Sequence, residues 1–572
     1  MLLSSSQKAT QSDKPIWYFL ICWTILNALQ AYKLEIHADE AYYWMYSRFL
    51  DWGYFDHPPM VAIFIRIGDS IMHNELGLRL ITLLTSTASL YFLWCILKKY
   101  TVNAQLFILV IAGTFIFHVY GFTTTPDAPL FFFTVLFYLF YQKYLENNSW
   151  LLALALGIII ACLLYSKYHA VLLILFTVLS NLKLLKRSSF WGIVVLATAL
   201  YIPHILWQIN HDYPSLNYHL YDRSAAKYNL ANSYLYIPGQ LLMAGPVIGW
   251  FLFYKVFTIR VKDAFIRCLL VNCIGTFLFF FISTFRGEAQ PHWTLIAFAP
   301  LVMLVLISFK QAGNNIPGWF YRVAIINISV ILFLRISIMF RIPPIANIGE
   351  IKSFYGFRDW AHAVKQKAGD NYVIMADGFQ NPSKYNYYTN STKGFSYDSR
   401  YYRRTQYDIW PIEEGFQHQR VYYLQDIPSD KTTDTIKVKA GKWYAEWVND
   451  TRTYQRVNIE VDSYKVKLSP GEKKSIVLKL TNPYPYPVNF SNDGQQHEAT
   501  LEACFFKGDN MVNAQKADST FNQILLPPYQ NSLYTFTLKA PLEKGEYEVL
   551  FSIHTTPFEG SKNSKILHLI VE

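Results

Sequence analysis

The sequence predicts a polytopic α-helical membrane protein that ends in a soluble region, and three observations support this. Of the 572 residues, 52% are hydrophobic and 16% are charged, a low charged fraction for a soluble protein of this length. From about Ile16 to Met339 the chain is a series of apolar runs, each near the length that crosses a bilayer. From about Arg341 to Glu572 its composition is that of a mixed, soluble sequence.

About eleven apolar segments are candidate membrane spans. The long run 151–182 is divided at its polar SKYH segment, because a single crossing needs only about 20 residues. The expected spans are 16–34, 77–97, 104–120, 130–144, 150–165, 169–183, 189–207, 236–254, 268–285, 293–309 and 319–339.

The formal net charge of +11 is explained by membrane topology. The basic residues gather in alternate short loops, and no zinc-finger spacing or P-loop supports a nucleic-acid or nucleotide partner. By the positive-inside rule these basic loops are cytoplasmic, which places the C-terminal region outside. They contain Lys98/Lys99, Lys143, Lys183/Lys186/Arg187, Arg260/Lys262/Arg267 and Lys310/Arg322.

The six cysteines give no sign of a disulfide framework or a thiolate metal site. Five of them lie in apolar runs and none forms a C-x-x-C pair. We interpret them as packing residues.

The first outside loop begins with HADEAYYW, in which Asp39 and Glu40 directly follow the first span. A carboxylate at the membrane boundary can act as a general base toward an acceptor hydroxyl. An N-cap at Asp39, before a helix that contains Tyr43, is an equally good interpretation of the motif alone. Both interpretations stay open at this point.

The same loop continues with GYFDHPPM, which places Asp56 and His57 before two prolines. The prolines prevent a helix from running through and fix an extended backbone. The motif is either a rigid turn with solvated polar groups or a rigid support for an acid and an imidazole at the membrane boundary.

Two further outside loops contain single charged residues. In TTTPDAP, Asp127 opens the next span and is by itself best interpreted as a helix cap. In SKYH, Lys167 is either a lysine that extends its ammonium to the interface or a cation that pairs with a lipid phosphate.

The last outside loop, RGEAQPHW, contains Arg286, Glu288 and His292. Glu288 and His292 could hold a divalent metal together with Asp56 or His57, although residues without a fixed spacing are a weak metal signal. We expect no cofactor beyond this candidate metal.

These motifs resemble a known family. HADEAYYW, GYFDHPPM, TPDAP, SKY and RGEAQPHW, in this order along hydrophobic spans, resemble the bacterial branch of the protein O-mannosyltransferase superfamily over about residues 16–340. This branch includes lipid A aminoarabinose transferases and rhizobial lipopolysaccharide galacturonosyltransferases, and the first-loop motifs are closest to the latter. The resemblance implies a GT-C fold and inverting transfer of one sugar from a polyprenyl-phosphate donor on the periplasmic side.

The resemblance also implies site residues. It maps the catalytic base onto Asp39, with Asp127 close to it, and Glu40 completes the predicted catalytic set. Lys167, Arg286, His57 and Tyr43 are the predicted partners of the donor phosphate, and Asp56, Glu288 and His292 are the candidate metal ligands.

Two positions depart from the aminoarabinose transferases. Those enzymes carry an arginine two residues after the DE pair and a lysine before the two prolines, where this chain has Tyr42 and His57. The departures put an aminoarabinose donor in doubt.

The C-terminal region predicts two domains after a membrane domain at 1–340. Residues 345–455 mix helix and strand patterns, with a helix at 357–368 and strands at 371–377 and 420–426, and predict a periplasmic α/β domain. Residues 461–572 contain short alternating strands between Gly, Pro and Asn turns, and predict a β-sandwich.

The sequence therefore predicts a multi-pass glycosyltransferase of the cell inner membrane. Its expected partners are a polyprenyl-phosphate sugar donor, a lipid, glycan or protein acceptor, and membrane lipids, but no nucleic acid. The alternative is a transporter or flippase, because charged residues in membrane segments also mark transport pathways.

Overall fold

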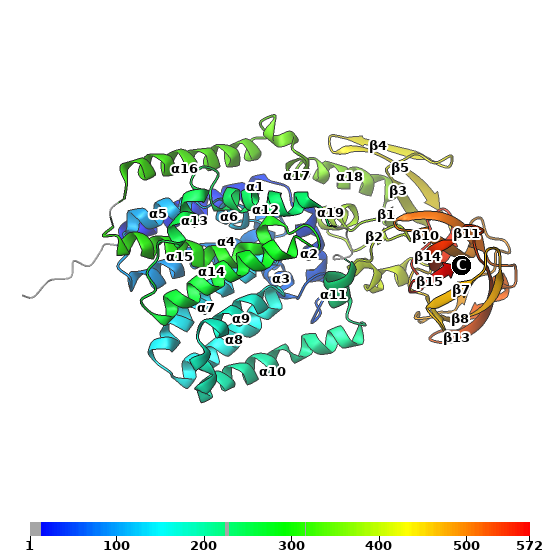
Figure 1. Cartoon of the computed structure of the whole chain (residues 1–572). Coiled ribbons are helices and arrows are strands. Elements are labelled where there is room, and N and C mark those ends of the chain that lie inside the picture. The colour runs from blue at the N-terminus through cyan, green and yellow to red at the C-terminus, as the bar shows by residue number, and fades with distance from the viewer. Residues whose placement is uncertain (1–12, 223–227, 315) are drawn as a thin grey trace, which may run out of the picture. The chain divides into compact units, whose positions relative to one another are not determined.

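The computed structural model describes residues 13–222, 228–314 and 316–572. The chain folds into two compact units, Met1–Phe354 and Tyr355–Glu572. The first unit is helical and the second is rich in strands (Figure 1).

The first unit has helices at all eleven predicted span positions. Within the described residues, six helices are long and apolar enough to cross a membrane, or up to seven if one bent pair counts as a single span, so the predicted number of eleven is not confirmed. The helices are α1 (Lys14–Lys33), α2 (Ala38–Arg48), α3 (Met60–Ile71), α4 (Glu75–Lys98), α5 (Ala104–Gly113), α6 (Phe115–Tyr120), α7 (Asp127–Glu146), α8 (Trp150–Ser166), α9 (Ala170–Ser180), η1 (Leu182–Lys186), α10 (Ser188–Asn210), α11 (Pro214–Asn217), α12 (Leu230–Ala244), α13 (Gly249–Val256), α14 (Ala264–Ser283), η3 (Pro291–Thr294), α15 (Leu295–Gln311), α16 (Gly318–Met339) and α17 (Gly349–Lys352).

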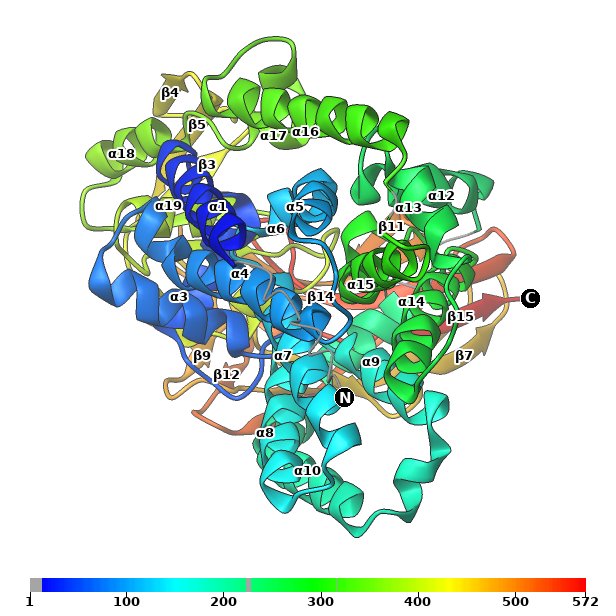
Figure 2. The ribbon, with the colours of Figure 1, turned by 90° about the vertical axis from the view of Figure 1, so that its left-hand side faces the viewer.

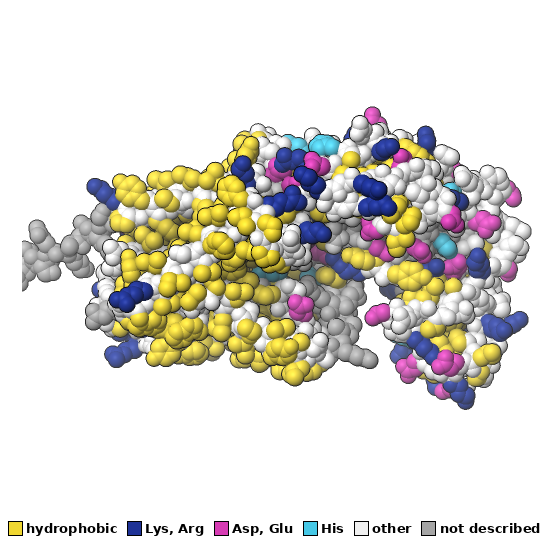
Figure 3. Space-filling model, turned by 90° about the horizontal axis from the view of Figure 1, so that it is seen from above, with side chains coloured by type: hydrophobic (Ala, Val, Ile, Leu, Met, Phe, Trp, Pro, Cys, Tyr) yellow, Lys and Arg dark blue, Asp and Glu magenta, His cyan; other side chains and the backbone are white. Residues whose placement is uncertain are grey.

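The core of this unit forms around α15. In its membrane-crossing window 89% of the residues are buried, whereas only 28% are buried in the window of α16, which lies at the edge of the unit (Figure 2). On the face in Figure 3, hydrophobic side chains cover the helices, and basic side chains lie at both margins of this apolar surface. This is the distribution expected of a multi-pass membrane protein.

The predicted span 236–254 is not one straight helix. α12 and α13 meet at an angle of 95°, and Gly245 at the break has a φ of +154°, a backbone conformation that favours glycine. Asn327 of α16 serves the broken backbone: its Oδ1 accepts from the amide of Val247 at 2.8 Å, and its Nδ2 donates to the carbonyl of Gly113 at 2.8 Å. Since lipid offers no hydrogen bonds, a helix break within a bilayer needs such a partner.

The second unit begins with the sheet of the α/β region, whose strand order is β2-β1-β3-β5-β4. β1 (Tyr372–Ala376) pairs in parallel with β2 (Gly394–Tyr397) and with β3 (Val421–Gln425). β3 pairs antiparallel with β5 (Gly441–Val448), and β4 (Asp434–Val438) forms the edge. The amphipathic helix α18 (Phe357–Ala368) buries Trp360 and Val364 in the core of this region, and α19 (Gln380–Tyr388) connects β1 to β2.

The rest of the second unit is a β-sandwich. One sheet has the order β11-β10-β14-β15-β7 and the other β13-β8-β6, with a core of side chains from both. The strands are β6 (Asn458–Val461), β7 (Lys465–Leu468), β8 (Lys473–Thr481), β9 (Val488–Asn489), β10 (Ala499–Lys507), β11 (Asn510–Lys516), β12 (Leu525–Leu526), β13 (Asn531–Lys539), β14 (Gly545–Thr555) and β15 (Leu567–Val571).

A buried ion pair joins the two parts of the second unit. Arg400, which follows β2, pairs with Glu502 of β10 at 2.5 Å. Burial raises the pKa of Glu502, but hydrogen bonds from His554 and Arg400 and the charge of Arg400 outweigh it and lower that pKa to about 2. The α/β sheet and the sandwich therefore form one compact unit.

The Asn327 contacts lead to a prediction about stability. Asn327→Leu removes the partners of buried backbone groups in two helix breaks, so we expect a loss of about 1–3 kcal/mol for each unsatisfied group. A thermal unfolding measurement on the detergent-solubilised chain checks this. The matched control Ile326→Leu, on the exposed side of the same helix, should leave the transition unchanged. An equal Tm for Asn327→Leu and the control would contradict the role of Asn327.

Candidate active site

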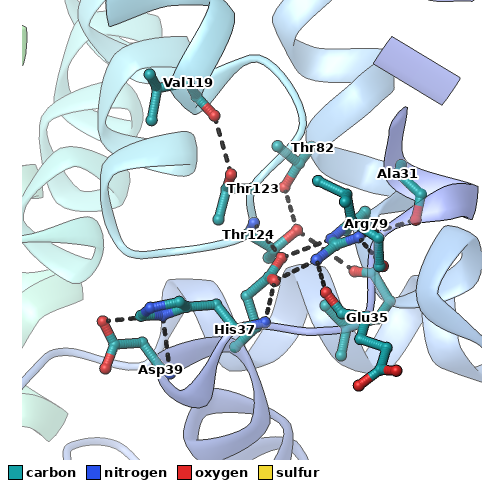
Figure 4. Close-up of polar contacts among 12 residues, drawn as sticks. Ala31, Glu35, His37, Asp39, Arg79, Thr82, Val119, Thr123 and Thr124 are labelled. Carbon is teal, nitrogen blue, oxygen red and sulfur yellow. Dashed lines mark hydrogen bonds and ion pairs between the residues drawn. The ribbon is translucent and has the colours of Figure 1, made fainter. Parts of the chain in front are cut away.

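A buried ion pair between Glu40 of α2 and Arg79 of α4 lies at the centre of the HADEAYYW motif. The Arg79 guanidinium donates to the two carboxylate oxygens of Glu40 at 2.8 and 2.6 Å. Its remaining donors reach the carbonyl oxygens of Ala31, Leu34 and Glu35 at 2.8–3.0 Å (Figure 4). All five N–H groups of the guanidinium are thus used.

The Glu40 carboxylate is equally occupied. Besides Arg79, it accepts from the backbone amides of His37 and Thr124, both at 2.9 Å. Burial raises the pKa of Glu40, but the charge and hydrogen bonds of Arg79 and the two amides outweigh it and hold that pKa below its usual value. This geometry favours a positioning role for Glu40, which ties the end of α1, the start of α2, α4 and the loop before α7 together.

Asp39 is placed differently from its neighbour. The N-cap of α2 is His37, which forms a capping box with Glu40, so the cap interpretation of Asp39 is wrong. The Asp39 side chain is 44% exposed, and its carboxylate lies 3.6 Å from His37 Nδ1, on the other side of His37 from Arg79 (Figure 4). An exposed carboxylate held on a fixed helix start has the position expected of a base that meets a substrate hydroxyl.

The predicted residues Asp127 and Lys167 form a second buried ion pair. Lys167 Nζ donates to the two carboxylate oxygens of Asp127 at 2.9 and 2.8 Å, and both side chains are at most 6% exposed. His292 Nε2 lies 3.9 Å from the same carboxylate. The N-cap of α7 is Pro126, and Lys167 is buried, so neither the cap interpretation of Asp127 nor the interfacial interpretation of Lys167 holds.

Asp56 lies in a pocket of tyrosine hydroxyls. Its Oδ2 accepts from Tyr42 at 2.8 Å and from Tyr46 at 3.4 Å, and its backbone oxygen accepts from His219 at 2.9 Å. The neighbouring His57 ring lies 5.8 Å from the ring of Tyr43. The double-proline segment is therefore a rigid support whose acid faces α2.

The Tyr43 hydroxyl lies within electrostatic range of three aspartates. Burial raises the pKa of the Tyr43 hydroxyl, and the negative charges of Asp39, Asp56 and Asp127 raise it further. Such an effect requires all three carboxylates to lie within electrostatic range of one hydroxyl. Residues from three segments, far apart in the sequence, thus converge on one site.

The predicted metal ligands do not converge. The described part of the chain has no group of three or more His, Cys, Asp or Glu side chains placed to hold a metal ion. Asp56 bonds to tyrosines, His292 lies beside Asp127, and the exposed Glu288 accepts from Gln290 at 3.1 Å. The predicted set of Asp56, Glu288 and His292 is therefore not assembled. Arg286, a predicted phosphate partner, is exposed in the loop before η3.

Sequence reasoning missed two arginines that shape the site. Arg79 pairs with Glu40, and Arg335 of α16 bonds to Asn27, Gln30 and His118. The guanidinium groups of the two arginines lie 5.5 and 5.8 Å from the ring of Phe122, in the loop that leads to Asp127. Each arginine lies inside an expected apolar span, and an arginine in such a position indicates a buried polar contact. This signal could have identified both residues from the sequence.

Comparisons with known proteins show what the chain is similar to. The family of dolichyl-phosphate-mannose-protein mannosyltransferases matches residues 56–207, a range that includes Asp56, Asp127 and Lys167. No curated protein sequence matches the chain.

Two solved structures of ArnT from Cupriavidus metallidurans are similar in fold. The apo structure aligns with a TM-score of 0.57 at 14% identity, and the structure bound to undecaprenyl phosphate with 0.54 at 13%. Each alignment covers 76% of this chain and 98% of the other. At this identity the likeness establishes the fold, which is that of a GT-C membrane protein with a C-terminal sheet region.

The contrast between Glu40 and Asp39 gives a prediction. Glu40→Gln breaks a buried ion pair and should lower the free energy of unfolding by about 3–5 kcal/mol, because Arg79 keeps an uncompensated charge. Asp39→Asn, one residue away and half exposed, should change it by less than about 0.5 kcal/mol. Denaturation of both variants in detergent checks this. A Glu40→Gln protein that is as stable as wild type but inactive would restore the predicted catalytic role of Glu40.

Proposed function

We propose that this chain, a member of the GT-C protein O-mannosyltransferase superfamily, transfers a single sugar from a polyprenyl-phosphate donor to an envelope acceptor with inversion. The observation that carries the proposal is a geometric one: the Glu40 carboxylate accepts from His37 and Thr124 and so holds the start of α2, with Asp39, beside the loop that leads to the Asp127–Lys167 ion pair. A solved structure of similar fold binds undecaprenyl phosphate, which supports a lipid-linked donor here.

In the proposed reaction the acceptor hydroxyl attacks the anomeric carbon of the sugar from the face opposite the phosphate. The bond between that carbon and the phosphate oxygen breaks, polyprenyl phosphate leaves with the bonding electrons, and Asp39 takes the hydroxyl proton. The exposure of Asp39 and its fixed place on α2 suit it to this step. The leaving phosphate already carries negative charge, so nearby cations lower the barrier without a proton transfer to it.

Lys167 is suited to hold that phosphate. An ammonium group has three donors, and the Asp127 carboxylate uses two of them in this structure. The third remains for a phosphate oxygen, while Asp127 fixes the position of the ammonium. His57 and the exposed Arg286 are further proposed phosphate partners, and the proposal assigns no step to a metal.

Variants at Asp39 and Lys167 test these roles separately. Asp39→Asn should lower turnover about a hundredfold or more with donor binding kept, because the proton acceptor is lost. Lys167→Ala should weaken the binding of undecaprenyl phosphate about tenfold or more, because a charge-assisted hydrogen bond is lost.

The measurement uses the purified chain with undecaprenyl-phosphate sugars and envelope lipids, and follows the release of undecaprenyl phosphate. Glu35→Gln in the same loop and Lys143→Ala at the other end of α7 are the matched controls and should keep activity and binding. Near-normal turnover of Asp39→Asn together with normal binding by Lys167→Ala would refute the site. Movement of the lipid without bond cleavage would favour the transporter alternative.

We also propose that the chain lies in the cell inner membrane with the site and the C-terminal unit on the periplasmic side. The alternation of basic loops supports this orientation. Ser463 is exposed. A cysteine at this position (Ser463→Cys) should be labelled by an impermeant maleimide in cells in which the outer membrane is permeabilised and the inner membrane is intact. Ser188→Cys, exposed at the basic end of α10, should be labelled only after the inner membrane is opened. The reverse pattern would overturn the orientation.

A further inference from the structure

Side chains at the end of α10 and just after it hold the segment of the first outside loop that leads to Asp56. Four hydrogen bonds of 2.7–2.9 Å reach residues 51–56 of this segment. They run from His204 Nδ1 to the Trp52 carbonyl, from Trp207 Nε1 to the Asp51 carboxylate, from the Ser215 hydroxyl to the Tyr54 carbonyl, and from His219 Nε2 to the Asp56 carbonyl. Gly53 permits this close approach, because a Cβ there would lie 2.5 Å from the Trp207 ring and 3.0 Å from His204 Nδ1.

His204 also contacts the SKYH segment, at the residue that directly follows Lys167. The buried His204 ring places its Nε2 at 3.2 Å from the Tyr168 hydroxyl. Because the Trp52 carbonyl can only accept, Nδ1 carries a proton, and in the neutral imidazole Nε2 then accepts from Tyr168. The imidazole therefore bridges the first outside loop and the SKYH segment.

Gln208, one turn further along α10, completes this network. One N–H of its side-chain amide donates to the Tyr168 hydroxyl at 3.0 Å, and the other donates to the Ser215 hydroxyl at 2.8 Å. The Tyr168 hydroxyl thus accepts from Gln208 and donates its own hydrogen to His204. Each hydrogen in the chain has an acceptor, which fixes the direction of the bond between Tyr168 and His204.

We propose that His204 is a positioning residue for donor binding, which acts through Tyr168 to fix the place of Lys167 relative to the first outside loop. The inference rests on the proposed role of Lys167 as a partner of the donor phosphate. The Asp127 carboxylate orients the Lys167 ammonium, and the Tyr168 contact holds the backbone from which the lysine side chain extends. Side chains that bind a ligand keep their place only when such supporting hydrogen bonds hold them.

Two substitutions separate the two hydrogen bonds of His204. His204→Asn places an amide nitrogen near the position of Nδ1 and keeps a donor for the Trp52 carbonyl. His204→Gln places an amide oxygen near the position of Nε2 and keeps an acceptor for Tyr168. We expect His204→Asn and Tyr168→Phe each to weaken the binding of undecaprenyl phosphate by the full chain in detergent about fivefold, the effect of one hydrogen bond. His204→Gln should keep the affinity, and turnover with saturating donor should stay at the wild-type rate in all three variants, because Asp39 is unchanged.

A double variant and a matched control show whether His204 acts through Tyr168. His204→Asn/Tyr168→Phe should bind no more weakly than either single variant, because both changes remove the same bond. Tyr165→Phe removes a hydrogen bond of 2.8 Å from the same part of the chain to the Leu200 carbonyl of α10, and should keep the affinity. Additive losses in the double variant, equal losses in His204→Asn and His204→Gln, or a fivefold loss in Tyr165→Phe would each overturn the inference.

Amide hydrogen exchange of residues 166–170 distinguishes this inference from the proposed function, because it needs no ligand. Exchange should be faster in His204→Asn and Tyr168→Phe than in wild type, and unchanged in His204→Gln. This pattern, found together with normal donor binding by Lys167→Ala, would refute the donor role of Lys167 and still support His204 as the residue that positions the segment. Unchanged exchange in all three variants would overturn the role of His204.

Discussion

The buried ion pair between Arg79 and Glu40 is the constraint on which the proposed site depends. One guanidinium satisfies carbonyl groups at the end of α1, and the carboxylate it holds accepts from the start of α2 and from the loop before α7. Because every donor of Arg79 and both oxygens of Glu40 are occupied, the four segments have little freedom to move separately. The neighbouring Asp39 thereby gains a fixed position, although its side chain is half exposed.

The two adjacent acids Asp39 and Glu40 therefore have different environments, which the sequence motif alone did not distinguish. Glu40 is fully buried and Asp39 faces outward from the same helix start. In the Asp127–Lys167 pair the two residues also have different roles: the Asp127 carboxylate balances the charge of Lys167 and orients its ammonium group. A balanced buried pair also explains how a charged lysine is accommodated among apolar helices.

Much of the fold could be predicted from the sequence, because hydrophobic runs and alternating strands report burial directly. The helix at 357–368 and the strands of the sandwich lie where their patterns placed them. The sequence analysis missed the 95° bend between α12 and α13, although Gly245 and Pro246 at the break are a helix-breaking pair. The contact of Asn327 with the broken backbone could not be predicted, because Asn327 lies far along the chain. By itself Asp127 was best interpreted as a helix cap, and Lys167 had two open interpretations. Only the folded structure shows that the two residues form an ion pair. The family match begins at Asp56, so the role of Asp39 still rests on its motif and its geometry.

Asn327 has a consequence for the way this chain is made. Its amide serves backbone groups near Gly113 and Val247, which are synthesised long before it. Until α16 is synthesised, the Gly113 carbonyl and the Val247 amide lack the Asn327 side chain as a hydrogen-bond partner. Water, the translocon or a chaperone must then satisfy or shield these groups. The last predicted membrane span, α16, therefore completes the hydrogen bonding of helices that precede it. In a chain cut short before α16, the backbone groups near Gly113 and Val247 would lack these hydrogen bonds.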